Sequence, residues 1–546
     1  EGFLNMPYFG HGANGIAEAA RRYFGKDIRR EKISLREAAI LASLNKSPSL
    51  YCPVYHKPEE PKLDKKMTEK EKEVLLNGYL VMLAKESVRI AHARGRYNWV
   101  LARMLSENFI TQNQYDSAIF KEDEPLGLDF VKLAPLKNDE FGYASRLVKE
   151  MLLATGYSDN KLSYYGGLKI VTTIDSQMQE IASEEFNRHL ANLNQEKDRA
   201  NQLDGAFIII DTGTGQIKAL TGGHDFNESQ YNRVLAFRSP GSLFKPFVYG
   251  SAMEYYDYGF YNKICNCQFS MRGVNGKRWS PKNFKEEHPV PQGYINFSTG
   301  LIRSVNLPTL NLARNIGIEP IVMFANQLGI WGNPGAVREP DGKVWFKKSG
   351  QKLKGGLDPK LPTAIGASDV NLLELANAYT VFFRNGTYIK PTLITEVRDF
   401  DGKILYKAEP PEEKRVISEN TARKIVILMR AVTKVGTAKI SMRNIEQQVA
   451  VKTGTSNGPS DLGMSGGTPE LVMAIRIGHD APRPIELPRY MKRVSGRSDM
   501  QVSGGWVVGP LFRKIIDRIY QTRRKIEFSP EIEQELKDLL ANYKDN

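Results

Sequence analysis

A serine and a lysine three residues apart form a pair with clear chemical potential in this sequence. They are Ser242 and Lys245, in the stretch FRSPGSLFKPFVYG at residues 237–250. A serine hydroxyl is a weak nucleophile unless a neighbouring base removes its proton. Side chains at positions i and i+3 share one face of a helix, so a helix that begins here brings the amine to the hydroxyl. The spacing therefore predicts nucleophilic catalysis.

The residues around this pair predict a turn that leads into a helix over 242–256. Pro240-Gly241 provides the turn, and Pro246 is compatible with the first helical turn because its missing N–H is not needed there. The first amides of a helix have no intrahelical acceptor. We therefore expect the amide of Ser242 to be available as an oxyanion donor.

A lysine acts as a base only if its pKa falls. The unperturbed pKa of about 10.4 must drop to roughly 7–8 for Lys245 to accept a proton near neutral pH. Burial and a second nearby cation both lower the pKa of a lysine. Lys452, in the β-rich segment QQVAVKTGTS, is the second cation if that strand lies beside the helix.

Motif order selects these residues from several matches. S-x-x-K and S-x-N are weak patterns, whereas K-T-G occurs once, at Lys452-Thr453-Gly454. One order places S-x-x-K at a helix start, S-x-N well downstream and K-T-G on a late strand; it is Ser242/Lys245, Ser304/Asn306 and K-T-G. The competing serines are Ser43, Ser158 and Ser349 for S-x-x-K, and Ser106, Ser158 and Ser418 for S-x-N.

Composition and charge limit the class of protein. The 546 residues are 41% hydrophobic and 25% charged, which is typical of a globular chain. The net charge of +14 favours anionic partners such as nucleic acid, lipid headgroups or a polyanionic polymer. No nucleic-acid-binding module accompanies this charge. Three cysteines (Cys52, Cys265 and Cys267) are too few for a disulfide framework, and Cys-Asn-Cys alone is a poor metal site.

Two glycine-rich motifs resemble known sites without their context. GHGANG, residues 10–15, matches a dinucleotide-binding pattern, but no predicted strand precedes it. GMSGG, residues 463–467, matches a nucleophile elbow. Only His479 follows it, and Glu470 is the one acid between them, which leaves no room for the usual triad spacing. We interpret GMSGG as a glycine-rich hairpin loop.

Residues 1–120 are predicted to be helical, with helices over 15–25, 34–45 and 98–109. Ser34 and Glu37 form a capping box for the second helix. The charged insertion 56–73 is predicted to be an exposed loop or a solvated helix. A connector over 121–200 contains a short strand at 167–174 and a helix at 176–193.

The β-rich pattern begins at 205–223, which predicts a hairpin, and returns at 447–456 and 470–480. Helices such as 369–386 lie between these strands. An antiparallel sheet whose strands come from both ends of a domain, with helices inserted, predicts an α+β fold. The predicted domains are 1–120, a connector at 121–200, the α+β domain at 201–512 and a helical tail at 513–546.

At these motifs the sequence resembles the class A penicillin-binding proteins, which are bifunctional peptidoglycan synthases. S-x-x-K followed by K-T-G belongs to the signature of serine β-lactamases and penicillin-binding proteins. SQYNRVLAFRSPGSLFKPFVY and LIRSVNLPTLNLARNIGI look like parts of the family's transpeptidase domain. FLNMPYFGHGANGIAEAARRYFGKDI looks like part of its all-α, lysozyme-like glycosyltransferase domain. The resemblance implies an α+β serine transpeptidase preceded by the C-terminal half of a glycosyltransferase domain.

The resemblance also implies a role for each motif residue. Ser242 would attack the penultimate D-alanine of a stem peptide, Lys245 would accept its proton, and Ser304 would relay a proton to the leaving amine. The backbone amides of Ser242 and Thr455 would form the oxyanion hole. β-Lactams would acylate the same serine, and no metal or cofactor is implied for this step. The residues expected to bind substrate are Asn306, Lys452, Thr453, Gly454 and Thr455.

The sequence departs from the family pattern at two places near K-T-G. Val451 replaces the usual glycine before the motif. Asp461 is followed by Leu462-Gly463, where the family usually has Trp-Phe. Neither change removes a reacting group, but the missing aromatic pair leaves the anchoring of the next strand open.

The glycosyltransferase half matches less completely. The family's two catalytic glutamates and its membrane helix precede the motif that matches Glu1–Asn5, so we expect no glycosyl transfer from these residues. The divalent-metal site of the intact family would be incomplete. Arg96 matches a basic position of the last glycosyltransferase motif, and Tyr97 stands where a second arginine is common.

The resemblance implies a cell-envelope enzyme at the periplasmic face of the inner membrane. Its expected partners are peptidoglycan stem peptides and glycan strands, β-lactams, the lipid-linked disaccharide of the intact family and other cell-wall synthesis proteins, with no nucleic acid. The alternatives are a D,D-carboxypeptidase or a β-lactam-binding sensor of the same fold. A β-lactamase is disfavoured because E-x-x-L-N occurs only at Glu73–Asn77, before the nucleophile.

Overall fold

The computed structural model describes residues 9, 13, 15–26, 28, 31–48, 50–52, 61, 67–121, 141–154, 168–195, 201–272, 278–284, 293–332, 356–399, 402–456, 458–488 and 502–543. The chain divides into two compact units. The smaller unit comprises residues 1–139, 151–169 and 398–405, and the larger comprises 140–150, 170–397 and 406–546.

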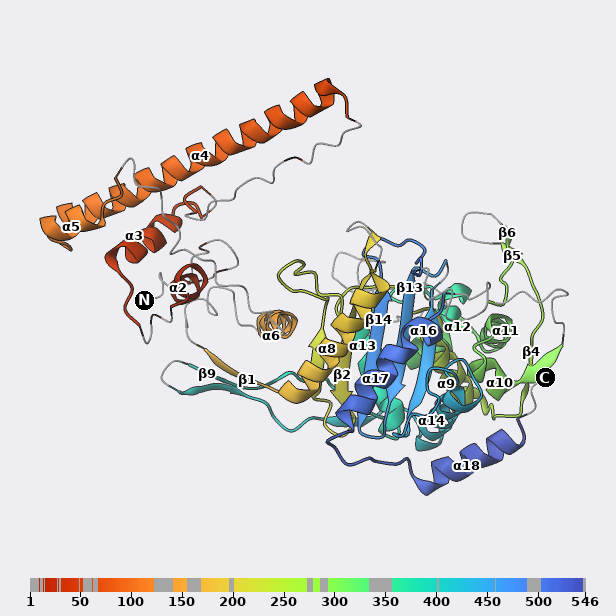
Figure 1. Ribbon diagram of the computed structural model, residues 1–546. Coiled ribbons are helices and arrows are strands. Elements are labelled where there is room, and N and C mark those ends of the chain that lie inside the picture. The colour runs from red at the N-terminus through yellow and green to blue at the C-terminus, as the bar shows by residue number, and fades with distance from the viewer. Residues whose placement is uncertain are drawn as a thin grey trace. The chain divides into compact units, whose positions relative to one another are not determined.

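The smaller unit is built from helices. They are α2 (Ile16–Phe24), α3 (Leu35–Leu44), α4 (Glu69–Ser106) and α5 (Gln112–Ala118) (Figure 1). The predicted helices at 15–25 and 34–45 correspond to α2 and α3, and the predicted capping box is present between Ser34 and Glu37. The predicted helix at 98–109 is only the end of α4, a 38-residue helix that begins inside the charged insertion.

The core of this unit explains the tyrosine at a position where the family commonly has arginine. Tyr97 on α4 is fully buried, together with Tyr23 from α2 and Leu41 from α3. The Tyr97 hydroxyl donates a hydrogen bond to the carbonyl of Tyr51. The neighbouring Arg96 instead lies over the ring of Trp99, with its guanidinium carbon 4.1 Å from the ring centroid. Tyr97 is therefore a core residue.

A five-stranded antiparallel sheet forms the centre of the larger unit. Its order is β12 (Ala450–Thr455), β13 (Asp461–Gly467), β14 (Leu471–Gly478), β2 (Asp204–Asp211) and β3 (Ile217–Thr221). The predicted hairpin at 205–223 is confirmed as β2–β3. Strands from both ends of the domain meet at the β14–β2 pair, where Ile475 lies opposite Phe207. The predicted α+β class is confirmed.

The interpretation of GMSGG as a hairpin loop is wrong. Residues 463–467 lie within β13, paired with β12 on one side and β14 on the other. A side chain on Gly463 would place its Cβ 2.9 Å from Leu243, and one on Gly466 (φ 139°) would meet the Ala450 carbonyl at 2.1 Å. Glycine is typical of loops, but this strand uses it because neighbouring backbone and helix approach too closely for side chains.

Helices cover both faces of the sheet (Figure 1). Helices α8 (Ser176–Leu193) and α17 (Gly509–Ile519) pack on one face, where Phe186, Phe207 and Ile516 belong to one buried cluster. Helices α13 (Leu372–Phe383) and α14 (Glu419–Lys434) contact strands of the sheet through its other side. The predicted helix at 176–193 coincides with α8.

The structure also describes further helices, 3-10 turns and short strands. Cys265 and Cys267, at and just after β4, form one disulfide, so the cysteines make a single short-range bridge and no framework. The helices and 3-10 turns are α6 (Gly142–Ala154), η3 (Gly241–Phe244), α9 (Lys245–Tyr256), α10 (Phe297–Ile302), α11 (Asn306–Ile316), α12 (Ile318–Gln327), η4 (Leu361–Ile365), α16 (Gly504–Val507) and α18 (Pro530–Ala541). The small sheets pair β1 (Lys169–Thr172), β9 (Ile394–Arg398) and β10 (Ile404–Lys407); β8 (Thr387–Ile389) and β11 (Glu413–Arg415); β4 (Lys263–Cys265) and β7 (Tyr294–Asn296); β5 (Met271–Arg272) and β6 (Arg278–Trp279).

Two helices connect segments that the predicted domain boundaries separate. Helix α17 spans the predicted boundary at 512, and its Ile515, Ile516 and Ile519 are buried in the sheet's core cluster. Helix α8 comes from the predicted connector but supplies Phe186 and Leu190 to the same cluster. The segment before the first sheet strand and the segment after the last one therefore jointly close one face of the α+β domain.

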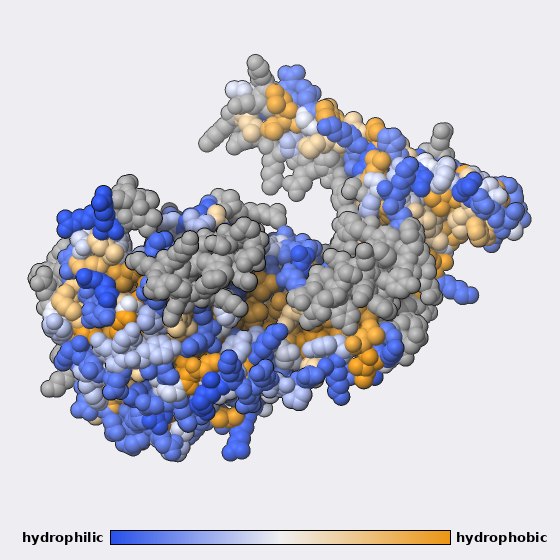
Figure 2. All heavy atoms as spheres, turned by 180° about the vertical axis from the view of Figure 1, so that it is seen from behind, coloured by the Kyte–Doolittle hydropathy of each residue, from blue (hydrophilic) through white to orange (hydrophobic). Residues whose placement is uncertain are grey.

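One face of the larger unit shows how polar and apolar side chains are distributed on the surface (Figure 2). On the face of the larger unit seen in Figure 2, hydrophilic side chains predominate and hydrophobic ones form small separate patches. Within the described residues, no helix combines the length and the apolarity needed to cross a bilayer.

Truncating the α8 contact with the sheet is expected to destabilise the larger unit. Phe186 is fully buried and its ring lies 5.5 Å from that of Phe207 in an edge-on arrangement. Phe186→Ala is predicted to lower the free energy of unfolding by about 3–5 kcal/mol. Glu180→Ala, on the exposed side of the same helix, is the control. Equal denaturant midpoints for the two variants would show that α8 is not part of this core.

Candidate active site

Ser242 lies in a tight turn immediately before a helix. The turn is the 3-10 segment η3, and α9 begins at Lys245, so the predicted helix over 242–256 starts one turn later than expected. Pro246 occupies the first turn of α9, as predicted. The carbonyl of Leu243 accepts a hydrogen bond of 2.8 Å from the buried Tyr379 hydroxyl on α13. This hydrogen bond fixes the turn that carries Ser242 to α13.

A glycine brings this turn against the K-T-G strand. Gly241 has a φ of 53°, in the left-handed region that favours glycine. A Cβ at Gly241 would lie 2.4 Å from the carbonyl oxygen of Thr455, and a Cβ at Gly454 would lie 2.6 Å from Leu243. Strand β12 and the turn carrying Ser242 therefore touch through positions where only hydrogen fits.

Lys245 is completely buried and faces the second motif. Its Nζ donates to the Ser304 carbonyl at 2.5 Å and to Asn306 Oδ1 at 2.8 Å, and lies 3.4 Å from Ser304 Oγ. The expected direct contact with Ser242 is not among the hydrogen bonds of the described residues. The sequence argument placed the amine on the correct element but did not foresee that Ser304 and Asn306 would hold it.

A second buried lysine meets the first at Ser304. Lys452 Nζ donates to Ser304 Oγ at 2.8 Å and to the Thr453 carbonyl at 2.9 Å. Burial, and then the charge of Lys452, lower the pKa of Lys245 well below its usual value. Burial also lowers the pKa of Lys452 to about 7. The structure thus brings together the two lysines that the sequence argument required to be neighbours.

Ser304 occupies a strained position between two helices. It lies between α10 and α11 with a φ of 57°, which non-glycine residues rarely adopt. Such a conformation costs about 1–3 kcal/mol and persists where the surroundings enforce it. Asn306, the first residue of α11, donates its Nδ2 to the Lys282 carbonyl at 3.1 Å, which fixes its Oδ1 toward Lys245.

These residues line a pocket of about 300 Å³. Ser242, Ser304, Asn306, Thr453 and Thr455 all contribute to its wall. Within it, the hydroxyls of Thr437 and Thr453 are 2.6 Å apart, and the Gly504 amide donates to Thr455 Oγ1 at 3.1 Å. Lining residues that the sequence motifs did not reveal are Phe284, Arg303, Ile365, Thr437, Ser456, Gly458, Ser503, Gly505 and Trp506. They lie outside the three motifs, and we find no pattern in the sequence that marks them.

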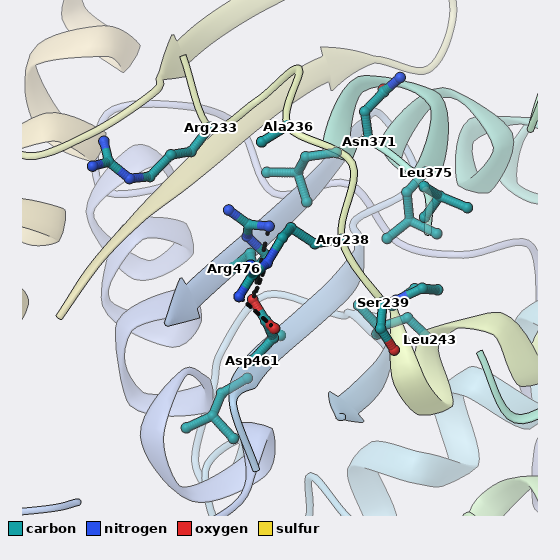
Figure 3. A pocket seen from close by; sticks show the side chains of 14 residues that line it. Arg233, Ala236, Arg238, Ser239, Leu243, Asn371, Leu375, Asp461 and Arg476 are labelled. Atoms are coloured by element: carbon teal, nitrogen blue, oxygen red, sulfur yellow. Dashed lines mark hydrogen bonds and ion pairs between the residues drawn. The ribbon is translucent and has the colours of Figure 1, made fainter. Parts of the chain in front are cut away.

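A cluster of ion pairs connects the segment before Ser242 to the first residue of β13. Arg238, four residues before Ser242, donates to both carboxylate oxygens of Asp461 at 3.2 and 3.0 Å. Arg476 on β14 lies 3.7 Å from the same carboxylate. Figure 3 shows both guanidinium groups directed at Asp461. The carbonyl of Asp461 also accepts from the Ser456 amide at 3.0 Å, so the cluster joins the chain before Ser242 to the turn after K-T-G.

This cluster explains how β13 is anchored without the usual aromatic pair. Leu462 is fully buried and is paired with Thr455 on β12 and with Ile477 on β14. Val451, which replaces glycine before K-T-G, is likewise fully buried in the core cluster of the sheet. Both departures from the family pattern are accommodated by core packing and leave the pocket open.

The competing serines have structural roles where the structure describes them. Ser43 donates to the Ala39 carbonyl within α3, and Ser418 caps the N-terminus of α14. Ser158, Ser349 and most of the glycine-rich segment 10–15 lie outside the described residues.

A pocket that contains Ser242 and Ser304, with two buried lysines of lowered pKa in contact with Ser304, is typical of serine enzymes that use lysine in place of histidine. Residues 205–465 match the family model of the penicillin-binding protein transpeptidase domain. Residues 1–77 match the transglycosylase family model. The chain belongs to the class A penicillin-binding proteins, which combine these two domains.

Individual relatives agree with this assignment. Penicillin-binding protein 1A of Aquifex aeolicus is 27% identical over 97% of this chain and 72% of its own length. Penicillin-binding protein 1F of Bacillus subtilis is 27% identical over 88% of this chain, which spans only 57% of that protein. The crystal structure of penicillin-binding protein 1A from Haemophilus influenzae shares the fold, with a TM-score of 0.63 at 19% identity over 96% of this chain and 86% of that one.

Removing the charge of Lys452 is expected to change the pH dependence of acylation. Neutral Lys245 is the proposed base, so acylation by penicillin should rise with pH through the lowered pKa of Lys245 and fall as Lys452 loses its charge above pH about 7. In Lys452→Met the repulsion is gone, the pKa of Lys245 rises, and the acidic limb moves to higher pH. The rate at the optimum should fall roughly 100-fold or more.

The measurement is the second-order rate constant for labelling by fluorescent penicillin, recorded as a pH profile between about pH 5 and about pH 10. Lys424→Met, a change on α14 distant in sequence from all three motifs, should keep the wild-type profile. An acidic limb at the same pH in Lys452→Met would contradict the electrostatic coupling of the two lysines.

Weakening the ion-pair cluster is expected to misplace Ser242. Asp461→Asn leaves Arg238 and Arg476 without their carboxylate, and loss of one partner of a buried pair costs about 3–5 kcal/mol. Acylation per folded molecule should fall roughly 10–100-fold because the turn and the strand lose register. Asp358→Asn removes a carboxylate that pairs with Lys360, where the two side chains are 45% and 54% exposed, and serves as the matched control. If the two variants are acylated equally fast at a temperature where both are folded, the cluster does not position Ser242.

Proposed function

We propose that this chain cross-links peptidoglycan stem peptides by D,D-transpeptidation through an acyl-enzyme at Ser242. The observation that carries the proposal is the convergence of Lys245 and Lys452 on Ser304 in the wall of the pocket that contains Ser242. The family assignment supports the same reaction class. Because the chain spans 57–72% of the first two relatives reported above, the activities of the whole protein are part of the proposal.

Lys245 is surrounded by three acceptors, the Ser304 carbonyl, Asn306 Oδ1 and, at 3.4 Å, Ser304 Oγ. In its neutral form the amine keeps two hydrogens for the two shorter hydrogen bonds and has one lone pair. This lone pair is the proposed acceptor of the Ser242 proton. Burial and the charge of Lys452 lower the pKa of Lys245 well below its usual value, which favours this neutral form.

The acyl-transfer step follows from this arrangement. Ser242 Oγ attacks the carbonyl carbon of the penultimate D-alanine while Lys245 takes its proton, which forms a tetrahedral oxyanion. The C–N bond to the terminal D-alanine then breaks, and Ser304 relays a proton to the departing amine. An amine from a second stem peptide attacks the ester and regenerates Ser242. Every group in this sequence of steps belongs to the chain or its substrates, and we propose that the reaction uses no metal or cofactor.

The remaining motif residues bind the donor peptide. Lys452 attracts the terminal carboxylate, and the hydroxyls of Thr453 and Thr455 donate to it. The amide of Asn306 contacts the donor backbone, and Gly454 gives the substrate strand access to the edge of β12. β-Lactams share the acyl-D-Ala-D-Ala shape, and the similar PonA1 protein from Mycobacterium tuberculosis, 21% identical with a TM-score of 0.58 over 71% of this chain and 95% of that one, has a structure in complex with penicillin V.

The wider context of the reaction follows from the family. We propose a cell-envelope location at the outer face of the inner membrane, with glycan strands and their stem peptides as partners. The transglycosylase part would act on lipid-linked disaccharide with a divalent metal in the complete protein. Other cell-wall synthesis proteins are the expected protein partners, and nucleic acid is not a partner.

A product analysis separates transpeptidation from the alternatives. The protein is incubated with a synthetic D-Ala-D-Ala donor peptide and an acceptor amine, and the products are resolved by mass spectrometry. We expect a cross-linked product that disappears in Ser242→Ala and falls at least about 100-fold in Lys245→Met, because an unassisted serine is a poor nucleophile. Hydrolysed donor alone would identify a carboxypeptidase. Labelling by penicillin without turnover of either kind would identify a sensor.

A further inference from the structure

The segment between α14 and β12, residues 435–449, borders two separate hollows. Its Thr437 lines the active-site pocket and lies 2.6 Å, hydroxyl to hydroxyl, from Thr453 of K-T-G. A few residues later, the same segment lines a second cavity of about 710 Å³, which we name the α14 hollow. Helix α14 and Glu533 of α18 complete the wall of the α14 hollow.

The α14 hollow carries excess positive charge. Four cationic side chains line it (Arg430, Lys434, Lys439 and Arg443), against two acidic ones (Glu446 and Glu533). Both acids are already engaged, since Glu533 accepts from Arg430 and Glu446 pairs with Lys525. Within the described residues, Lys434, Lys439 and Arg443 form no ion pair with a carboxylate of the chain. The hollow is therefore suited to an anionic ligand.

A buried acceptor in the same wall lacks a donor. The side chain of Gln447 is in the wall of the α14 hollow, and the residue is only 2% exposed. Its Nε2 donates to the Ile526 carbonyl at 2.5 Å, which fixes the orientation of the amide. Its Oε1 has no hydrogen-bond partner in the structure. A buried acceptor without a donor is unfavourable, and an N–H group from a ligand would satisfy it.

We propose that the α14 hollow binds a short peptide bearing free carboxylates, and that its binding tunes acylation at Ser242. The carboxylates pair with Lys434 and Arg443, a backbone N–H of the peptide donates to Gln447 Oε1, and the exposed Ile440 offers an apolar contact at the rim. A volume of about 710 Å³ accommodates several amino-acid residues. The charge and the unpaired acceptor together select a ligand that carries both a negative charge and a donor, which a peptide supplies and a fully deprotonated anion such as sulfate does not.

The coupling to the active site runs through the backbone of residues 435–449. Thr437 is fixed on its active-site side by Thr453 and by close packing, since a Cβ on Gly505 would lie 2.5 Å from the Thr437 carbonyl. A ligand that contacts residues 439–447 restricts the other side of the same short segment. Thr437 then keeps Thr453 in the position that binds the donor carboxylate. This part of the proposal rests on the proposed role of K-T-G, whereas the binding itself does not.

Binding is tested on protein whose active site is already blocked. Wild-type chain is first acylated with penicillin, and an acetylated Ala-Glu-Lys tripeptide with free carboxylates is titrated by calorimetry. We expect one site per chain, with affinity reduced at least about tenfold in Lys434→Met/Arg443→Gln because two charge-assisted contacts are lost. Lys537→Met, an exposed lysine of α18 outside the α14 hollow, should bind like wild type. No binding, or equal binding by the double variant, overturns the proposal.

Two further measurements complete the test. Gln447→Leu removes the unpaired acceptor, and with it the donor to the Ile526 carbonyl, so it is titrated at a temperature where the variant is fully folded. Binding should weaken severalfold, which keeps the test informative if the double variant folds poorly. A tripeptide with the alternating L and D centres of a stem peptide, compared with its all-L counterpart, identifies whether cell-wall peptide or an ordinary peptide is the preferred source. Binding of either supports the site, and binding of neither rejects it.

The regulatory arm measures acylation of unblocked protein by fluorescent penicillin with and without the tripeptide. We expect at least a twofold change in rate for wild type and none for Lys434→Met/Arg443→Gln. An identical response in both proteins would mean that the peptide acts at the active site. Failure of transpeptidation in the earlier product analysis would leave the calorimetric result unaffected, so the two proposals fail separately.

Discussion

The site depends on two buried lysine side chains that both contact one serine, Ser304. Burying either lysine in its charged form is costly, and burying both within reach of Ser304 adds mutual repulsion. Burial lowers the pKa of both lysines, and the charge of Lys452 lowers that of Lys245 further. A weakly basic, desolvated amine is what general-base catalysis near neutral pH requires. Burial and repulsion, which are unfavourable for charged lysines, therefore lower the pKa in the way that the proposed general-base step requires.

Close backbone contact is what makes this burial achievable. The turn at Gly241 and the strand at Gly454 meet where any side chain would collide with the opposite segment. Gly463 and Gly466 do the same for β13 against Leu243 and β12. The ion pairs at Asp461 then hold the two sides together from behind. The glycines allow the turn and the strands to approach closely, and the ion pairs at Asp461 hold these segments together. Both lysines are buried as a result, while the pocket that contains Ser242 stays open.

Sequence reasoning was most reliable where one local rule decides the outcome. The capping box at Ser34, the hairpin at 205–223 and helix α8 each follow from short-range pattern, and each is present. The order of three motifs selected Ser242 and Ser304, and both line one pocket, but their catalytic roles stay predictions. The start of α9 was misplaced by one turn because a 3-10 turn and a helix have the same sequence signals over four residues.

Other features required information that no local pattern contains. GMSGG has the composition of a loop, and it is a central strand only because β12 and β14 are already in place on either side. The hydrogen bonds of Lys245 to Ser304 and Asn306 join residues about 60 positions apart, which only the folded chain brings together. Helices α8 and α17 pack on one face although more than 300 residues separate them. Long-range packing, rather than propensity, decided each of these.

The conformation of Ser304 connects the strain of the fold to its chemistry. In a continuous helix the carbonyl of this residue would bond to an amide four residues later, and its hydroxyl would point away along the helix surface. The left-handed turn between α10 and α11 instead presents carbonyl and hydroxyl to the same side, where Lys245 and Lys452 use one each. Asn306 supplies the remaining acceptor for Lys245 from the first position of α11. A conformational cost of about 1–3 kcal/mol at one residue thus brings both lysines to Ser304, in the wall of the pocket that contains Ser242.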